Sequence, residues 1–356
     1  MHVPDGFLDL PTSLATGAIA AGAVGIALTK AAPEIRRTGP ALPGLLAAFI
    51  FAAQMINFPV GIGTSGHLMG GALAAVLVGP WTAVIVMTAV LLVQGLLFAD
   101  GGLSAMGTNI VLIGLVTVLV GYLVAAAATK ALPRGRAGTV AAASLGAFVS
   151  VPVAAAVFVG LYALGGTHPV PMGAMTAAMV GWHVLVGIGE ALITGAVVSA
   201  VLASRPDLVY LTGAQRTDLL VVTSEGSRHV SATTHAEEPD STTRGTKTLL
   251  TWGLSLTLLV AGVVSLFASS SPDGLESVAA SLGFEEAAGD SAVASGPLAD
   301  YGVAGFDAVW ATSIAGIVGV AVVAALAYAA LALLARRRDA SGDSASLQPA
   351  AGRDGH

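Results

Sequence analysis

The sequence predicts an all-α polytopic membrane protein, with a bundle of about seven helices followed by a two-helix module that has an extracellular loop. Two observations support this prediction. Of the 356 residues, 55% are hydrophobic and only 10% are charged, whereas globular proteins carry about 25% charged residues. Apolar runs also recur along the chain, and several reach the length of about 20 residues that crosses a bilayer. The chain has no cysteine, which excludes disulfides and thiolate metal sites.

The candidate helices are nine apolar runs, seven before a polar break and two after it. They span residues 13–32, 43–60, 67–80, 81–98, 108–128, 139–165, 172–204, 249–268 and 309–335. The run at 67–80 has about 14 residues, which is short for a full span. We therefore expect a short or half-inserted helix there, packed against protein.

Composition divides the chain into four parts. Residues 1–204 form a first membrane domain, and residues 205–246 are mostly polar and predict a flexible cytoplasmic linker. Residues 247–338 carry the last two helices, with a polar, acidic extracellular loop at 269–307. Residues 339–356 are rich in Ser, Gly and Ala and predict a disordered cytoplasmic tail.

The basic residues orient the chain. If all nine runs cross the membrane, all 15 Lys and Arg fall on one side, and none lies in residues 1–9, 57–66, 165–171 or 269–307. The positive-inside rule then places the N-terminus outside and the C-terminus in the cytoplasm of a bacterial or archaeal-type cell membrane. Carboxylates without basic residues on the outer face would concentrate divalent metal ions. A solvated acidic loop is the alternative.

Residues 1–9, which we call the N-terminal strip, suggest a metal chelate. They lack a basic n-region and a cleavage site, so we expect Met1 to begin the mature chain with a free amine. Pro4-Asp5-Gly6 predicts a tight turn that folds the strip back onto the protein. The Met1 amine, the His2 amide and the His2 imidazole suit Ni(II), Cu(II) and Co(II). The alternative is a solvated terminal histidine.

His67 is the candidate fourth nitrogen donor. It lies in a glycine-rich stretch, residues 63–71, at the outer start of the short run. With Met1 and His2 it would complete a square plane that rejects Mg(II) and Ca(II), because those ions prefer oxygen ligands. The alternative for His67 is a residue that merely begins a helix after a glycine loop.

His183 and Glu190 are polar residues inside the run at 172–204. Their spacing of seven residues puts both on one helix face. Ionisable groups inside a membrane are functional or paired, so a functional pair and a buried polar lock between helices both remain open. No catalytic residue is predicted, because the sequence contains no Walker A, His-Glu-x-x-His or Gly-x-Ser-x-Gly motif.

Several motifs together resemble a known family. Residues 1–204 are similar to CbiM and NikM, the substrate-specific (S) components of energy-coupling factor (ECF) transporters for cobalt and nickel. The C-terminal part resembles CbiN and NikN, the PDGLE type, so the chain looks like a natural fusion. The motifs that carry the resemblance are residues 1–9, 66–71, 99–102, 107–109, 183–190, 272–276, 283–285 and 297–302.

The resemblance implies the function and the partners. It implies a substrate-binding component of an ATP-driven importer for Co(II) or Ni(II), with the metal held by Met1, His2 and His67. The expected partners are ATP-binding-cassette ATPase subunits, a transmembrane coupling (T) subunit and membrane lipid, without nucleic acid. Transported metal is the ligand, and no permanently bound cofactor is expected. Many members carry a second Asn three residues after the one at Asn109, where this chain has Leu112.

Asn109, His183 and Glu190 are candidate supporting or coupling residues. The sequence also leaves several other functions open. A Ni(II)-specific member of the family is one alternative. A stand-alone secondary metal transporter that uses Glu190 and His183 as a proton relay is another. An intramembrane enzyme lacks a recognisable nucleophile or zinc motif, and a membrane scaffold leaves the pairing of His2 with His67 unexplained.

Overall fold

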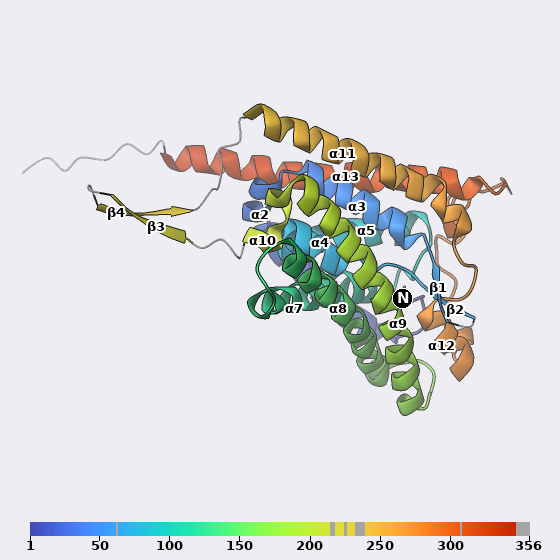
Figure 1. Cartoon of the computed structure of the whole chain (residues 1–356). Coiled ribbons are helices and arrows are strands. Elements are labelled where there is room, and N and C mark those ends of the chain that lie inside the picture. The colour runs from blue at the N-terminus through green and yellow to red at the C-terminus, as the bar shows by residue number, and fades with distance from the viewer. Residues whose placement is uncertain (62, 214–217, 224–225, 232–238, 307, 347–356) are drawn as a thin grey trace, which may run out of the picture.

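The computed structural model describes residues 1–61, 63–213, 218–223, 226–231, 239–306 and 308–346, and these residues form a helical bundle (Figure 1). Seven segments of this described part are long and apolar enough to cross a membrane. They confirm the predicted all-α polytopic fold. The segments are α1 (Leu10–Lys30), α5 (Pro80–Leu97), α6 (Met106–Asn109) with η1 (Ile110–Val116) and α7 (Thr117–Ala131), α8 (Arg136–Gly165), α9 (Met172–Ser204), α11 (Pro239–Gly262) with η3 (Val264–Phe267), and α13 (Ala311–Ser346).

The run at 67–80 forms the short helix that the sequence predicts. Helix α4 (Gly71–Val78) has eight residues, all buried, and it packs against α5, α7 and α8. Gly70 and Gly79 flank it with φ of 81° and 94°, which only glycine adopts readily. Helices α2 (Ala32–Thr38) and α3 (Ala41–Gln54) and the antiparallel pair β1 (Phe58–Gly61) and β2 (Thr64–Gly66) precede it in the chain.

Small residues allow the helices to approach closely. A Cβ on Gly146 of α8 would lie 2.3 Å from the carbonyl oxygen of Gly121 in α7, and a Cβ on Gly107 would lie 2.4 Å from the Cα of Gly17 in α1. Close packing of glycines is a common basis for helix association in membranes. The glycine content therefore fixes how tightly the bundle closes around its centre.

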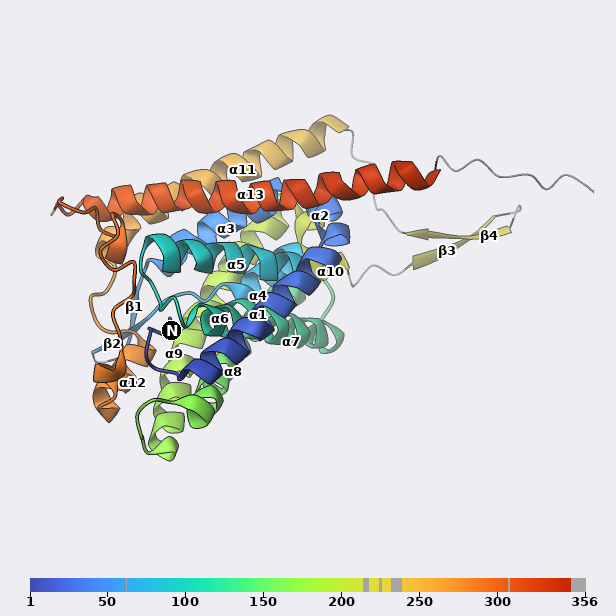
Figure 2. The same ribbon diagram turned by 180° about the vertical axis from the view of Figure 1, so that it is seen from behind.

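The last two long helices form a layer on one side of the bundle. Helices α11 and α13 pack against each other and against α3 (Figure 2). The segment between them, predicted as a polar loop at 269–307, contains a helix, α12 (Gly274–Leu282), and the short turns η4 (Glu285–Ala287) and η5 (Ala299–Tyr301). The Gly289 N–H donates to the Asp5 carbonyl at 2.7 Å, so this segment reaches the N-terminal strip.

The segment predicted as a linker, residues 205–246, contains regular structure in its described part. It includes η2 (Pro206–Leu208), α10 (Tyr210–Gly213), the hairpin β3 (Asp218–Thr223) and β4 (Gly226–Ser231), and the start of α11. The apolar residues 219–222 lie within β3. Helix α13 extends to Ser346, into the segment predicted as disordered, and residues 347–356 lie outside the described part. The hairpin and the N-terminus lie at opposite ends of the bundle in both views (Figures 1 and 2).

Candidate metal centre

No residue of the N-terminal strip is exposed, and the His2 side chain is only 8% exposed, which disagrees with a solvated terminal histidine. Met1 is 3% exposed and Val3 is fully buried. The predicted turn forms, with Gly6 at φ 89°. A Cβ at Gly6 would lie 2.2 Å from the Ala287 carbonyl oxygen, so only glycine fits beneath the C-terminal module there.

Two side chains hold the strip in place. The Asp5 carboxylate accepts hydrogen bonds from the backbone N–H groups of Leu103 at 3.1 Å and Ser104 at 2.7 Å. The Asn109 side chain accepts from the Val3 N–H at 2.7 Å and donates to the Val3 carbonyl at 3.1 Å. Asn109 is therefore a supporting residue for the strip. Leu112, three residues after Asn109, is buried in the apolar core.

The three candidate metal-binding residues come together. The Met1 amine nitrogen lies 2.5 Å from His67 Nε2. The His2 and His67 rings stack with centroids 4.9 Å apart and planes at 17°. Two nitrogens bound at right angles to one ion at about 2.0 Å would lie roughly 2.8 Å apart. The Met1–His67 separation is close to this value.

Burial keeps both imidazoles in the form that binds metal. Desolvation, followed by the nearby N-terminal ammonium, lowers the pKa of His2 and of His67 to about 3. Both rings are therefore neutral at neutral pH, as metal ligands must be. His67 Nδ1 lies 2.9 Å from the Leu68 carbonyl, which favours the tautomer with the proton on Nδ1. That tautomer leaves the Nε2 lone pair directed at Met1.

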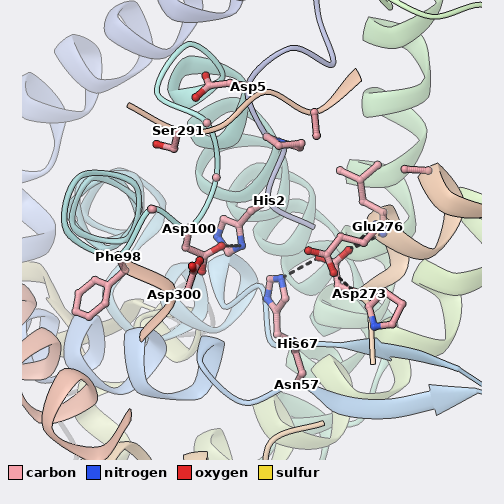
Figure 3. A pocket seen from close by; sticks show the side chains of 18 of the residues that line it. His2, Asp5, Asn57, His67, Phe98, Asp100, Asp273, Glu276, Ser291 and Asp300 are labelled. Atoms are coloured by element: carbon pink, nitrogen blue, oxygen red, sulfur yellow. Dashed lines mark hydrogen bonds and ion pairs between the residues drawn. The ribbon is translucent and has the colours of Figure 1, made fainter. Parts of the chain in front are cut away.

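The C-terminal module places a carboxylate against the amine. Asp273 Oδ2 lies 2.8 Å from the Met1 nitrogen and 3.8 Å from His67 Nε2. Burial alone would raise the pKa of Asp273. The N-terminal ammonium, His67 and the hydrogen bonds to the carboxylate together outweigh burial and hold that pKa well below its usual range. Asp273 is thus an anion next to the donor nitrogens (Figure 3).

A second carboxylate contacts His2. Asp100 Oδ1 lies 3.1 Å from His2 Nδ1, and Asp100 Oδ2 accepts from the Tyr301 hydroxyl at 2.6 Å. Gln94 Nε2 donates to the same hydroxyl at 3.2 Å. A chelate that includes the His2 amide must use Nδ1 of the same residue. Ligation therefore requires the His2 ring to turn from Asp100 to the ion.

A cavity of about 710 Å³ lies between the strip and the C-terminal module. His2 and His67 line it, and Figure 3 shows them between Asp100 on one side and Asp273 on the other. We call it the acidic cavity, because its ionisable lining consists of these histidines and six carboxylates, without Lys or Arg. Such a cavity attracts cations. The six are Asp5, Asp100, Asp273, Glu276, Glu285 and Asp300.

Side chains alone do not complete a metal site. Among the described residues, no three His, Cys, Asp or Glu side chains are grouped to hold a metal ion. An ion between Met1, His2 and His67 would therefore depend on the amine and the His2 amide. These are main-chain nitrogens, and only a free N-terminus offers the first of them.

His183 and Glu190 are buried on one face of α9, as predicted, but they contact backbone and not the donor nitrogens. His183 Nδ1 lies 2.7 Å from the Met179 carbonyl. Glu190 accepts from the N–H groups of Met69 at 2.6 Å and Gly70 at 2.8 Å. This geometry favours the polar lock over a relay between the two residues.

The Pro-Asp-Gly-Leu-Glu motif builds the start of α12. The Asp273 carboxylate accepts from the N–H groups of Leu275 and Glu276, and the Glu276 carboxylate accepts from the Asp273 N–H, which is a capping box. A Cβ on Gly274 would lie 3.0 Å from His183 Cε1, so glycine allows α12 to dock on α9.

A larger side chain at this glycine is expected to undock α12. The Thr64 and Ser277 hydroxyls lie 2.8 Å apart, and the chain has no cysteine of its own. A Thr64→Cys, Ser277→Cys protein should therefore crosslink efficiently, and adding Gly274→Val should lower the yield several-fold. Ala280→Val, on the exposed side of α12, is the control. Equal crosslinking with and without Gly274→Val would contradict the docking.

The sequence analysis did not single out Asp100, Asp273 or Tyr301. Their only signal was their place in the motifs at 99–102, 272–276 and 297–302, which carry the family resemblance. The capping box at residues 273–276 was the one readable sign of a helix in that segment.

The chain is similar to a known protein family, to several named transport proteins and to a solved structure. A family described as "Cobalt uptake substrate-specific transmembrane region" matches residues 2–208, and the PDGLE domain matches residues 247–336. A "Putative fused nickel transport protein NikMN" of Archaeoglobus fulgidus is 34% identical over 92% of this chain and 97% of its own length. A "Cobalt transport protein CbiM" of Sorangium cellulosum is 30% identical over 59% of this chain and 94% of its own. A solved transition metal transporter is 29% identical, with a TM-score of 0.51 over 57% of this chain and 93% of its own.

Proposed function

The chain belongs to the cobalt uptake substrate-specific transmembrane family, with a C-terminal PDGLE domain, and we propose that it is the substrate-binding component of an ATP-driven importer for Co(II) or Ni(II). The observation that carries this proposal is the buried N-terminal amine, 2.5 Å from His67 Nε2. A free terminus is seldom buried without a role, because termini are usually exposed and poorly ordered.

The ion is the cargo, and nitrogen donors hold it. The Met1 amine, the deprotonated His2 amide, the His2 imidazole and His67 Nε2 supply a planar set that fits Ni(II) or Co(II) and rejects Mg(II) and Ca(II). This donor set does not separate nickel from cobalt, and the relatives named above include transporters of both.

Capture takes place at the outer face, through the acidic cavity. Its six carboxylates attract the cation, and one of them, that of Asp273, lies 2.8 Å from the Met1 nitrogen. ECF ATPase subunits and a T subunit then supply the energy for delivery inward, since the chain has no Walker A motif of its own.

The proposal expects metal binding but no active transport by the chain alone. Purified chain in liposomes, with a pH gradient imposed and a metal-sensitive dye inside, should bind Ni(II) or Co(II) and leave the dye unchanged. The stand-alone transporter predicts dye response driven by the gradient. Glu190 and His183 are tied to backbone groups, which does not favour a relay between them. Gradient-driven uptake by the purified chain would overturn the assignment as a component.

A further inference from the structure

Glu190 is a buried carboxylate with an unusual set of partners. It is fully buried in α9, and both of its oxygens accept hydrogen bonds from consecutive backbone N–H groups. Within the described part of the chain, no Lys, Arg or His forms an ion pair with it. An ionisable group inside a membrane domain is costly, so its presence calls for a specific task.

The two N–H groups belong to the segment that carries His67. Met69 and Gly70 follow His67 by two and three residues, and Glu190 holds both. Gln54 Nε2 donates to the Met69 carbonyl at 2.8 Å, so the peptide on either side of Met69 is fixed. Gly70 has no room for a side chain against Ile50, where a Cβ would lie 2.7 Å from Cγ2.

The hydrogen bonds from Glu190 and Gln54 to residues 69 and 70, which we call the clamp, are linked to the donor atom His67 Nε2. His67 Nδ1 lies 2.9 Å from the Leu68 carbonyl, and Leu68 is the residue between His67 and the clamped Met69. The position of that carbonyl therefore sets the rotation of the ring. Ring rotation in turn sets the direction of Nε2, which lies 2.5 Å from the Met1 amine.

We propose that Glu190 is a positioning residue for the metal centre, acting through residues 68–70 to aim His67 Nε2 at the amine. The inference rests on the proposed function, because it requires His67 to be a ligand. Functional groups must be held within about 0.5 Å of their working geometry, and metal ligands depend on their outer partners for this.

The same chain offers a matched carboxylate. Glu34 in α2 is 3% exposed and accepts from the backbone N–H groups of Trp81 at 3.3 Å and Thr82 at 2.7 Å, at the start of α5. The Glu190 carboxylate contacts the residues just before α4, and the Glu34 carboxylate lies against Gly79, just after its end. Each carboxylate accepts hydrogen bonds from two consecutive backbone N–H groups, but only Glu190 holds the His67 segment.

The test compares Glu190→Gln with Glu34→Gln in the full chain with its native N-terminus. Ni(II) alone is the probe, and the readouts are affinity, the visible absorption of the bound ion and the thermal midpoint. A glutamine amide offers one acceptor and opposes the second N–H with its own donors, so each variant leaves one backbone group unpaired. Both variants should therefore lower the thermal midpoint.

Only Glu190→Gln should change the metal centre. We expect about 10- to 100-fold weaker Ni(II) binding, which is the usual loss when a residue that orients a metal ligand is removed. We also expect an absorption spectrum shifted toward that of His67→Ala. Glu34→Gln should retain the affinity and spectrum of the unmodified chain. If Glu190→Gln lowers the midpoint but keeps both metal readouts, the residue only stabilises the fold and the proposal is wrong.

A second variant covers the case in which Glu190→Gln does not fold. Gln54→Leu removes the other hold on Met69 without touching Glu190, and it should shift the same spectrum in the same direction by a smaller amount. His67→Ala separates the two hypotheses. Unchanged binding in His67→Ala would refute the proposed metal site, whereas lost binding there with intact binding in both clamp variants would refute the positioning role alone.

Discussion

Two residues added ahead of Met1 are expected to weaken Ni(II) and Co(II) binding by more than about 100-fold, beyond the usual loss for an outer partner of a metal ligand. The extension converts the amine into a peptide nitrogen, which removes one donor and leaves every side chain unchanged. It also breaks the 2.8 Å contact between the Met1 nitrogen and Asp273. Isothermal titration of the purified full chain measures the effect.

A removable extension gives the control for bulk at the buried terminus. If the added segment ends in a protease site that leaves Met1 first, the same sample can be titrated before and after cleavage. Cleavage should restore the affinity of the native chain. Binding that is equally tight before cleavage would mean that the ion does not use the amine, and the donor set proposed here would have to be abandoned.

The fold was predictable because membrane solvation leaves a strong one-dimensional signal. Long apolar runs identified the seven crossing segments, and the short run at 67–80 gave the buried α4. The run at 43–60, predicted to cross as well, gave α3, which has 14 residues and is too short to count among the seven. Helix neighbours were not predictable in the same way. The lipid-facing and core-facing sides of these helices are both apolar. In α1, for example, the large apolar side chains of Leu14 and Ile19 lie on the exposed side. The sequence therefore lacks the amphipathic pattern that would assign faces.

The donor residues were predictable and their surroundings were not. Met1, His2 and His67 carry nitrogen chemistry that can be recognised from residue type and from the predicted side of the membrane. Asp273 reaches the amine from more than 270 residues along the chain, through the docking of α12 on α9. Sequence analysis missed α12 because a capping box in a polar segment is a weak signal without the apolar surface on which the helix packs.

Glu190 shows what periodicity can and cannot give. Its spacing from His183 correctly placed both on one face of α9. The partners of that face are the His67 segment for Glu190 and Gly274 for His183, and neither is near α9 in sequence. The pattern therefore identified two residues of interest but not the contacts that explain them.

Replacing His67 by glycine should give the second large effect, a loss of Ni(II) affinity of at least about 10- to 100-fold, because a direct ligand counts for no less than an outer partner. The amine, amide and imidazole of residues 1 and 2 would remain as a three-nitrogen chelate with water in the fourth position. The visible absorption of bound Ni(II) should shift accordingly, since water is a weaker ligand than imidazole. Titration and absorption spectra of the full chain measure both changes.

Free imidazole provides the decisive control for the His67 variant. Glycine leaves a space where the buried ring stood, and His67→Gly keeps the N-terminal strip and its hold by Asn109 intact. Millimolar imidazole should therefore enter that space, ligate the ion and return the spectrum of the native chain. It should have no such effect on the extended chain, which lacks the amine instead of the ring. If His67→Gly binds Ni(II) like the native protein, or if imidazole restores both proteins alike, His67 is not the fourth ligand. The nitrogens of residues 1 and 2, together with the acidic cavity, would then have to account for metal capture.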